Sequence, residues 1–153
     1  MILLWHGRDP IGIVIFSSPA ASLRQRSRAL GLTGCRNAIT MAALNEQLWV
    51  LQRVVIHPTY RGAGIAAGFV RRACQLCPVD WIETLSVMGR VNPFFERAGF
   101  RRIGVIRRSA GSTRAGIYGV NHRTKSASSS PPDRFSAPVY YLFDNRGRPR
   151  PLR

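Results

Sequence analysis

Short apolar runs separated by turn-forming residues dominate the first two thirds of the chain. Five runs rich in Ile, Val, Leu and aromatic residues predict β-strands, at residues 1–7, 11–17, 48–56, 79–87 and 100–106. The turn signal Arg8-Asp9-Pro10 joins the first two into an expected hairpin. Pro58 ends the 48–56 strand, the strongest of the five, because proline donates no hydrogen bond to a ladder.

A helical period replaces the strand pattern after residue 64. Apolar residues with a 3.6-residue spacing predict a helix over residues 65–76. The apolar positions are Ile65, Phe69, Ala73 and Leu76, and the polar face has Arg71 and Arg72. Shorter helices are expected within residues 20–30, at 37–47 with Asn37 or Thr40 as cap, and from Asn92 to Ala98, followed by Gly99 as a left-handed cap.

Strands that alternate with helices predict an α/β (α+β) domain, and 153 residues suit one such domain with some spare length. We expect this domain to occupy residues 1–108. From 109 to 153 Gly, Ser, Thr and Arg dominate, which predicts a basic tail with a flexible linker over residues 126–132. An additional strand is expected within the tail at residues 138–143.

The net charge of +16 is concentrated in that tail. Residues 1–48 carry five basic and two acidic groups, residues 49–100 six and three, and residues 101–153 twelve and two, which gives +3, +3 and +10. Nucleic acid is therefore one candidate partner of the tail. Attraction of an anionic nucleotide cofactor is the milder consequence.

The three cysteines, Cys35, Cys74 and Cys77, are too few and odd in number for a disulfide framework. Cys74 and Cys77 form a C-x-x-C, but no second pair follows to complete a zinc site, so we interpret them as small apolar residues near a helix end and expect no metal. No apolar run is long enough to span a membrane, and no signal peptide is evident. A cytoplasmic location is expected.

The segment Arg61-Gly62-Ala63-Gly64-Ile65-Ala66 lies between a predicted strand and a predicted helix. Glycines allow positive φ and a close approach of backbone to ligand, and the free N–H groups of a helix's first turn attract anions. No Lys-Ser/Thr pair follows, so this is not a Walker A sequence. The order strand, glycine turn and helix predicts a phosphate-binding loop.

Two motifs in this chain resemble those of the GNAT superfamily of N-acetyltransferases. Residues 54–66, V-V-I-H-P-T-Y-R-G-A-G-I-A, are similar to its cofactor motif, in which a strand ending in V-x-P precedes R-G-x-G-[IL]-[GA]. Residues 92–100, N-P-F-F-E-R-A-G-F, are similar to the second signature N-x-x-Y-E-K-x-G-F. The resemblance covers about residues 1–107 and, more loosely, extends to acetyltransferase-like domains fused to ABC-type ATPases.

The resemblance implies a mixed central sheet flanked by helices, and acetyl-CoA as co-substrate. The backbone of Val54, Val55 and Ile56 would pair with the pantetheine arm, and one N–H there would polarise the thioester carbonyl. The pyrophosphate would bind to the amides of Arg61, Gly62, Ala63, Gly64, Ile65 and Ala66. Asn92 would contact the cofactor arm, with Phe95 beside the thiol. An amine would attack the thioester directly.

Three features depart from the family pattern. Phe95 replaces the usual tyrosine and has no proton to donate to the thiolate, so Tyr60 and Tyr118 are the candidate substitutes. The central strand has no carboxylate to act as general base, so Glu46, Glu83 and His57 are candidates, with a structural role favoured for His57. Glu83 either faces the cleft or is solvated, and Glu96 is expected on a helix surface.

The chain also begins at what resembles the family's second strand, so we expect an N-terminally short domain. Either the chain is a fragment, or a partner domain or subunit supplies the missing wall. The leading functional hypothesis is transfer of an acetyl group to a primary amine of a small molecule or protein. The alternatives are a CoA-binding accessory domain without catalysis, such as the partner of an ATPase, and a nucleic-acid-associated protein that acts through its tail.

Overall fold

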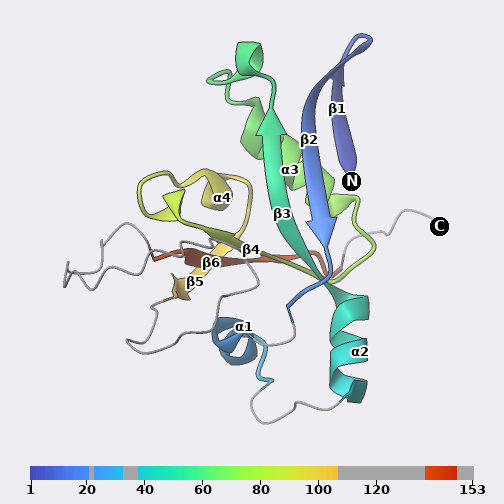
Figure 1. Ribbon diagram of the computed structural model, residues 1–153, viewed down its shortest axis with the longest axis vertical. Helices are drawn as coiled ribbons and strands as arrows, with labels where there is room; N and C mark the ends of the chain where they lie inside the picture. Colours follow the sequence, from blue (N-terminus) through green and yellow to red (C-terminus); the bar gives the residue numbers. More distant parts are fainter. Residues whose placement is uncertain (21–22, 33–37, 107–136, 148–153) are drawn as a thin grey trace, which may run out of the picture.

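The computed structural model describes residues 1–20, 23–32, 38–106 and 137–147. Within these residues six strands form one mixed sheet in the order β1-β2-β3-β4-β6-β5, which confirms the α+β class (Figure 1). The strands are β1 Ile2–His6, β2 Asp9–Ser17, β3 Leu48–Ile56, β4 Trp81–Ser86, β5 Arg101–Val105 and β6 Val139–Asp144. The α-helices are α1 Arg24–Ala29, α2 Ala38–Gln47, α3 Ile65–Gln75 and α4 Phe94–Arg97, and the two short 3₁₀-helices are η1 Pro58–Tyr60 and η2 Met88–Arg90.

The elements expected from the pattern are confirmed within the described residues. β1 and β2 form the expected hairpin, although β2 already begins at Asp9 because Gly7, with φ of 61°, makes the turn. Gly99 adopts φ of 95° after α4, as a left-handed cap requires. Asn37, the 126–132 linker and Tyr118 lie outside the described residues.

The additional strand expected at residues 138–143 is an interior strand of the sheet. β6 pairs antiparallel with β4 on one side and with β5 on the other. All of its residues from Val139 to Phe143 are buried. Residues 139–144 therefore belong to the same sheet as the strands before residue 108.

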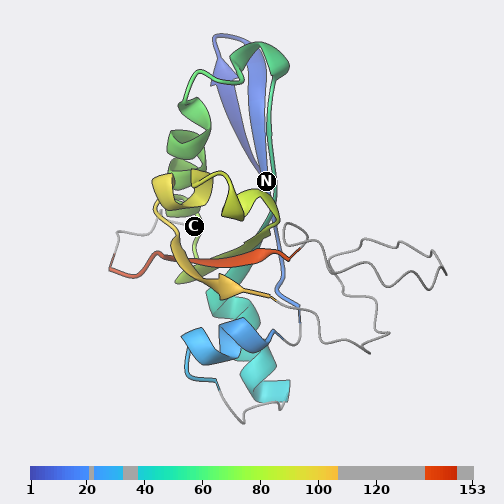
Figure 2. The same ribbon diagram turned by 90° about the vertical axis from the view of Figure 1, so that its left-hand side faces the viewer.

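The main core lies between the sheet and α3. Phe69, Val70, Ala73 and Cys74 of α3 are buried against Val14, Ile56 and Ile82 of the strands. Figure 2 shows α3 against one side of β1–β3. The expectation that Leu76 extends the apolar stripe of this helix is wrong, because α3 ends at Gln75 and the Leu76 side chain is 40% exposed.

Cys74 and Cys77 are both free and buried, as expected for small apolar residues at the end of a helix. Burial raises the pKa of the Cys74 thiol far above its usual range and that of Cys77 to about 12. Within the described residues no group of three His, Cys, Asp or Glu side chains has the arrangement of a metal site. None of the described helices has the length and apolar character needed to cross a membrane.

Candidate functional site

The only parallel pair in the described sheet opens into a wedge. β3 and β4 pair through Leu48–Trp81, Trp49–Ile82 and Val50–Glu83, and the pairing ends there. β3 then continues to Ile56 beside β2, while β4 continues to Ser86 beside β6. Figure 1 shows the two halves of the sheet diverging from this point, with β3 upright and β4 crossing it. The wedge therefore exposes one edge of β3 beyond Val50 within the described residues.

A side chain of β4 fixes the vertex of the wedge. The Thr84 hydroxyl, 3% exposed, donates a hydrogen bond of 2.9 Å to the carbonyl of Leu51. Thr84 and Leu51 are the first residues beyond the backbone pairing on their strands. From Val50 to Ile56 the open edge is about 20 Å long, at roughly 3.3 Å per residue.

The ladder with β2 determines which backbone groups face the wedge. The His57 N–H donates to the Ile11 carbonyl at 2.8 Å, so this is a hydrogen-bonded antiparallel pair, and bonded pairs alternate along a ladder. Val55 consequently turns its N–H and C=O toward β2, whereas Val54 and Ile56 turn theirs toward the wedge. The Ile56 carbonyl accepts a hydrogen bond of 3.1 Å from Arg61 Nε, in agreement with this direction.

This alternation corrects one expectation from the family resemblance. Of residues 54–56, only Val54 and Ile56 present backbone groups to a ligand in the wedge, because the ladder with β2 uses those of Val55. The Ile56 carbonyl is already bonded to Arg61. A pairing ligand would thus meet the N–H and C=O of Val54 and the N–H of Ile56.

The open edge of β3 leads directly to the glycine loop. Gly62 and Gly64 adopt φ of 85° and 76°, conformations that side-chain-bearing residues rarely take. A Cβ built on either residue meets no atom within 4 Å, so the space beside both is open. Residues 61–64 are exposed, and residues 65 and 66 are half-buried. The loop therefore has the backbone geometry and the accessibility of an anion-binding turn.

Gly64 is the N-cap of α3, and the N–H groups of the helix's first turn have no intrahelical partners. Arg61 differs from the rest of the loop, because its N–H already donates to the Pro58 carbonyl at 3.1 Å. The amides available to bind an anion are therefore those from Gly62 to Ala66, without that of Arg61. The Arg61 side chain links the loop to the end of β3, because its Nε donates a hydrogen bond to the Ile56 carbonyl.

Neither models of known protein families nor curated proteins match this chain.

Glu83 is not free to act as a base, because it lies in a buried ion pair. The carboxylate accepts hydrogen bonds from Arg26 at 2.8 and 2.5 Å and from the Tyr140 hydroxyl at 2.9 Å. Arg26 and Glu83 are 2% and 1% exposed. Both interpretations of Glu83 from the sequence, a cleft residue or a solvated one, are therefore wrong. No local spacing in the sequence connects Arg26, from α1, to Glu83, so this pair could not be predicted.

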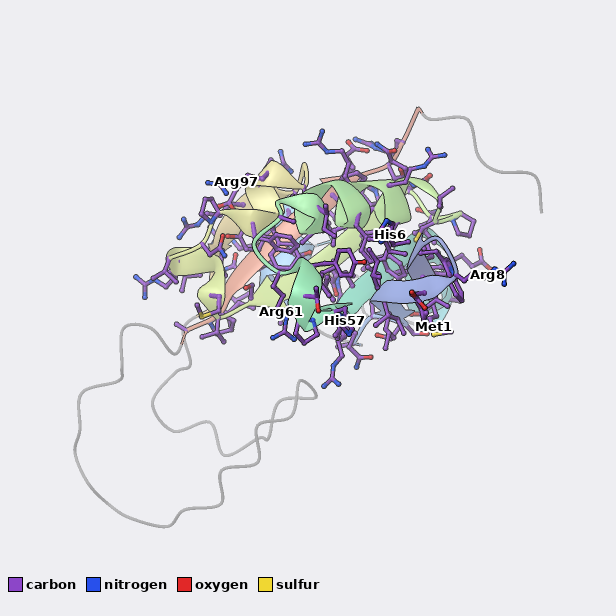
Figure 3. The ribbon with its side chains drawn as sticks, turned by 90° about the horizontal axis from the view of Figure 1, so that it is seen from above. Met1, His6, Arg8, His57, Arg61 and Arg97 are labelled. Carbon is purple, nitrogen blue, oxygen red and sulfur yellow. The ribbon has the colours of Figure 1, made fainter. Side chains whose placement is uncertain are left out.

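Tyr60 points away from the wedge. Its hydroxyl lies 2.6 Å from Nδ1 of His6 on β1, and its ring makes edge contacts with the rings of His6 and His57. β1 is two strands away from β3, on the side opposite β4. In Figure 3 His57 lies beside Arg61, and His6 lies toward the hairpin. Tyr60 and His57 thus join the loop to the hairpin.

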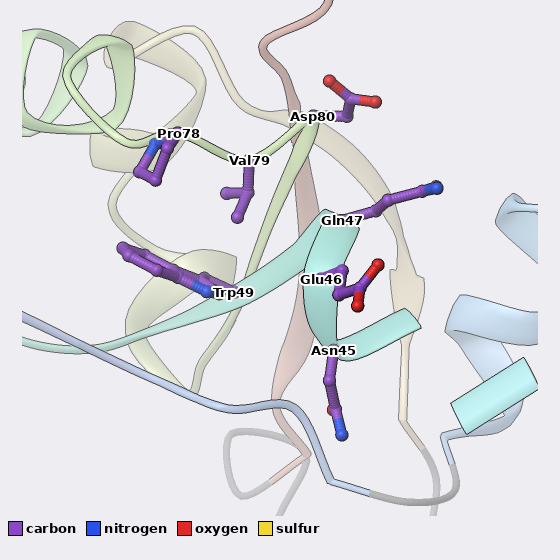
Figure 4. Close-up of a pocket in the computed structure, with 7 residues that line it drawn as sticks. All are labelled: Asn45, Glu46, Gln47, Trp49, Pro78, Val79 and Asp80. Carbon is purple, nitrogen blue, oxygen red and sulfur yellow. The ribbon is translucent and has the colours of Figure 1, made fainter. Parts of the chain in front are cut away.

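Glu46 lies beyond the vertex, at the opposite end of β3 from the glycine loop. Its exposed side chain lines a hollow of about 550 Å³ whose other walls include Trp49, Val79 and Asp80. Figure 4 shows the Trp49 indole beneath Val79, whereas the Glu46 carboxylate points to the other side. The structure therefore separates Glu46 from the amides of the loop by the length of β3.

Phe95 lies close to the wedge within an aromatic cluster. Its ring centroid is 5.4 Å from those of Phe100 and Tyr141, and Tyr141 is opposite Thr84 in the sheet. Asn92 is exposed in the turn before α4, where its N–H donates to the Met88 carbonyl at 2.9 Å.

Tyr141 supplies the hydroxyl beside Phe95 that the sequence did not reveal. The hydroxyl lies within hydrogen-bonding distance of the Gly89 carbonyl, at 3.0 Å, and of Glu96 Oε1, at 3.1 Å. Burial, followed by the hydrogen bond with Glu96, raises the pKa of Tyr141 to about 12. Glu96 lies on α4 as expected, but it is half-buried with its carboxylate bonded to Tyr141, so it is not a solvated surface residue. At neutral pH this hydroxyl is a structural donor.

Proposed function

We propose that the chain is a CoA-binding protein of the GNAT type, and that it transfers an acetyl group from acetyl-CoA to a primary amine in the cytoplasm. One arrangement supports this proposal above all. The open edge of β3 ends at an exposed turn with two positive-φ glycines, and that turn begins α3. A pantetheine arm needs a strand edge, and a diphosphate needs free amides at a helix N-terminus.

Acetyl-CoA would bind along β3 in one orientation. The diphosphate lies against the amides from Gly62 to Ala66, and the arm runs along the wedge toward the vertex at Thr84. The N–H groups of Val54 and Ile56 are the donors available to the arm or to the thioester carbonyl. In the reaction the amine nitrogen bonds to the acetyl carbon and the C–S bond breaks. The nitrogen loses one proton, and the departing thiolate takes up one proton through solvent to become the free thiol.

A second candidate is binding of a CoA compound without catalysis, as in an accessory domain of a larger assembly such as an ATPase. A specific observation favours it. Glu83 is neutralised by Arg26, Tyr60 is bonded to His6, and Phe95 has no hydroxyl. None of the three is poised as a general acid or base, so any transfer depends on amines that are already neutral or on proton transfer through water.

Calorimetric titration with acetyl-CoA tests CoA binding, which both candidate functions require. Gly62→Asp/Gly64→Asp places negative charge and side chains where the diphosphate would lie, so binding is expected to be lost. Gly31→Asp/Gly147→Asp is the matched control, because Gly31 and Gly147 also have positive φ, of 69° and 74°, and open space. Equal affinity in the two double variants, or no affinity of the unmodified chain for any CoA species, would refute the proposal.

Release of free thiol with a panel of amines separates the two candidates. Turnover above the rate without protein supports transfer, whereas binding without turnover supports the accessory role. The nucleic-acid hypothesis concerns residues 109–153, most of which lie outside the described residues. Salt-dependent binding of DNA or RNA that disappears on removal of residues 109–136, a deletion that retains β6, would support it.

A further inference from the structure

A hollow lies between the helices α1 and α2 and the beginning of strands β3 and β4. Figures 1 and 2 both show these two helices on the side of β4 and β6 that faces away from α4. The volume of the hollow is about 470 Å³, which is in the range of pockets that hold small molecules. The glycine loop follows the opposite end of β3, so this hollow is separate from the proposed CoA site.

Most of the lining of the hollow is apolar. Leu48 and Trp81 are paired across the parallel ladder and line the hollow from the sheet. The other apolar residues come from the end of α1 and from α2, and they are Ala29, Leu30, Leu32, Ala43 and Leu44. Such walls release water when an apolar part of a ligand covers them.

Both charged residues of the lining are arginines. Arg101 of β5 is exposed and has no hydrogen-bonded or ion-paired partner among the described residues. The guanidinium of Arg146, just after β6, lies 4.2 Å from the centroid of the Trp81 ring. It donates from Nε and Nη2 to Asp144 at 3.1 and 2.8 Å. These contacts hold the Arg146 guanidinium in place and leave its Nη1 available to a ligand.

Two carboxylates lie near these arginines, but neither lines the hollow. Asp144 is bonded to Arg146 and also interacts electrostatically with Arg101. The side chains of Arg146 and Asp144 are 59% and 49% exposed, so water screens this pair. Asp80 interacts with Arg146 through its charge and lines the other hollow, beside Glu46. The charged groups that the lining itself presents to a ligand are therefore both positive.

We propose that this hollow binds a carboxylate attached to an apolar body, such as a medium-chain fatty acid. The apolar body lies against the leucines and Trp81, and the carboxylate accepts hydrogen bonds from Arg101 and from Nη1 of Arg146. Guanidinium N–H groups match the planar geometry of a carboxylate. An alkylammonium ion would meet two like charges, and a small polar anion would leave the apolar walls uncovered. The proposal requires neither CoA binding nor acetyl transfer.

Calorimetric titration of the nuclease-treated chain with decanoate, below its micelle concentration, tests this inference. Decanoate is expected to bind at one site, and decylammonium and acetate are each expected to bind at least about 10-fold more weakly. Arg101→Gln is expected to weaken decanoate binding about 10-fold. Arg102→Gln is the matched control and should leave the affinity nearly unchanged. It removes the same charge from the next residue of β5, whose side chain lies on the other face of the sheet with Tyr141.

Two further variants test the apolar lining. Leu44→Asn is expected to weaken decanoate binding, whereas Leu76→Asn, at a residue 40% exposed at the end of α3, is the control. Tryptophan fluorescence should change on decanoate binding, and Trp81→Phe should largely abolish this change, since Trp5 and Trp49 do not line the hollow. Circular dichroism of each variant verifies that it is folded.

Three results would each overturn the inference. They are no measurable affinity for decanoate, equal affinity for decylammonium or acetate, and equal effects of Arg101→Gln and Arg102→Gln. Gly62→Asp/Gly64→Asp is expected to bind decanoate like the unmodified chain, and Arg101→Gln is expected to bind acetyl-CoA like the unmodified chain. The two titrations therefore distinguish failure of this inference from failure of the proposed function.

Discussion

Arg26 and Glu83 form a doubly hydrogen-bonded ion pair, at 2.8 and 2.5 Å, between α1 and the centre of the sheet. Arg26 is the only buried residue of α1, so the helix is attached to the sheet mainly through this charge pair. Arg26 Nη1 also donates to the Ala20 carbonyl at 2.7 Å. A buried pair of this kind fixes a position in the fold, and the loss of one partner leaves the other charge buried.

Arg26→Met is therefore expected to lower the free energy of unfolding by about 3–5 kcal/mol, the usual cost of an unpaired buried charge. Urea denaturation at pH 7 measures the change. Arg26→Met/Glu83→Gln, which removes both charges, is expected to recover part of that loss. Arg28→Met, at an exposed position of the same helix, is the control and should change stability by no more than about 0.5 kcal/mol. Equal effects of the two single variants would contradict the structural role of the pair.

The vertex of the wedge depends on one hydroxyl. Thr84→Val keeps the side-chain shape but leaves the buried Leu51 carbonyl without its hydrogen bond, so it is expected to cost about 1–3 kcal/mol of unfolding free energy. Ser86→Ala on the same strand, with a half-buried side chain, is the control and should have a smaller effect. Chemical denaturation of both variants measures the difference. An unchanged free energy of unfolding in Thr84→Val would show that this hydrogen bond does not hold the two strands together.

Stability is expected to fall at alkaline pH. In the unfolded chain the pKa values of cysteine and tyrosine are 9.0 and 10.0. In the folded chain burial raises the pKa values of Cys77 and Tyr141 to about 12. The unfolded state therefore releases protons first, so the contribution of these groups is complete below pH 9 and is lost between about pH 9 and 12. Tyr141→Phe should flatten the decline above pH 10. A stability that stays constant from pH 9 to 12 would contradict these pKa shifts.

The buried C-x-x-C is expected to be chemically inert in the folded chain. Because the thiolate is the reactive form, raised pKa values and burial should keep Cys74 and Cys77 unmodified by iodoacetamide at pH 8. Peptide mass spectrometry after labelling, with and without 8 M urea, reports each cysteine separately. Rapid labelling of either residue without urea would show that this end of α3 opens readily.

The sequence predicted the local elements because their signals are local. The apolar run in residues 48–56, Pro58, and the glycines at 62 and 64 specify a strand, its end and a turn without reference to the rest of the chain. The wedge was not predictable in this way, because it depends on where the pairing of β3 with β4 stops. The interior place of β6 likewise depends on pairing with strands distant in sequence, Trp81–Ser86 and Arg101–Val105.

The same distinction between local signals and long-range contacts applies to the candidate site. The glycine loop was identified from composition and order, whereas the partners of Glu83 and Tyr60 were not predicted. Glu83 meets Arg26 across 57 residues, and Tyr60 meets His6 across 54. No period or spacing reports such contacts. Even within the loop, the bond from the Arg61 N–H to the Pro58 carbonyl becomes apparent only from the 3₁₀ turn between them.

Amide hydrogen exchange with and without acetyl-CoA tests the central claim most directly. The amides from Gly62 to Ala66, and those of Val54 and Ile56 at the wedge edge, should exchange quickly in the free chain and become protected in the complex. Val55 and Arg61 should change little, since their N–H groups are already hydrogen-bonded. Protection confined to Val54, Ile56 and the amides from Gly62 to Ala66 is the predicted result, and unchanged exchange of these amides at saturating acetyl-CoA would contradict the account.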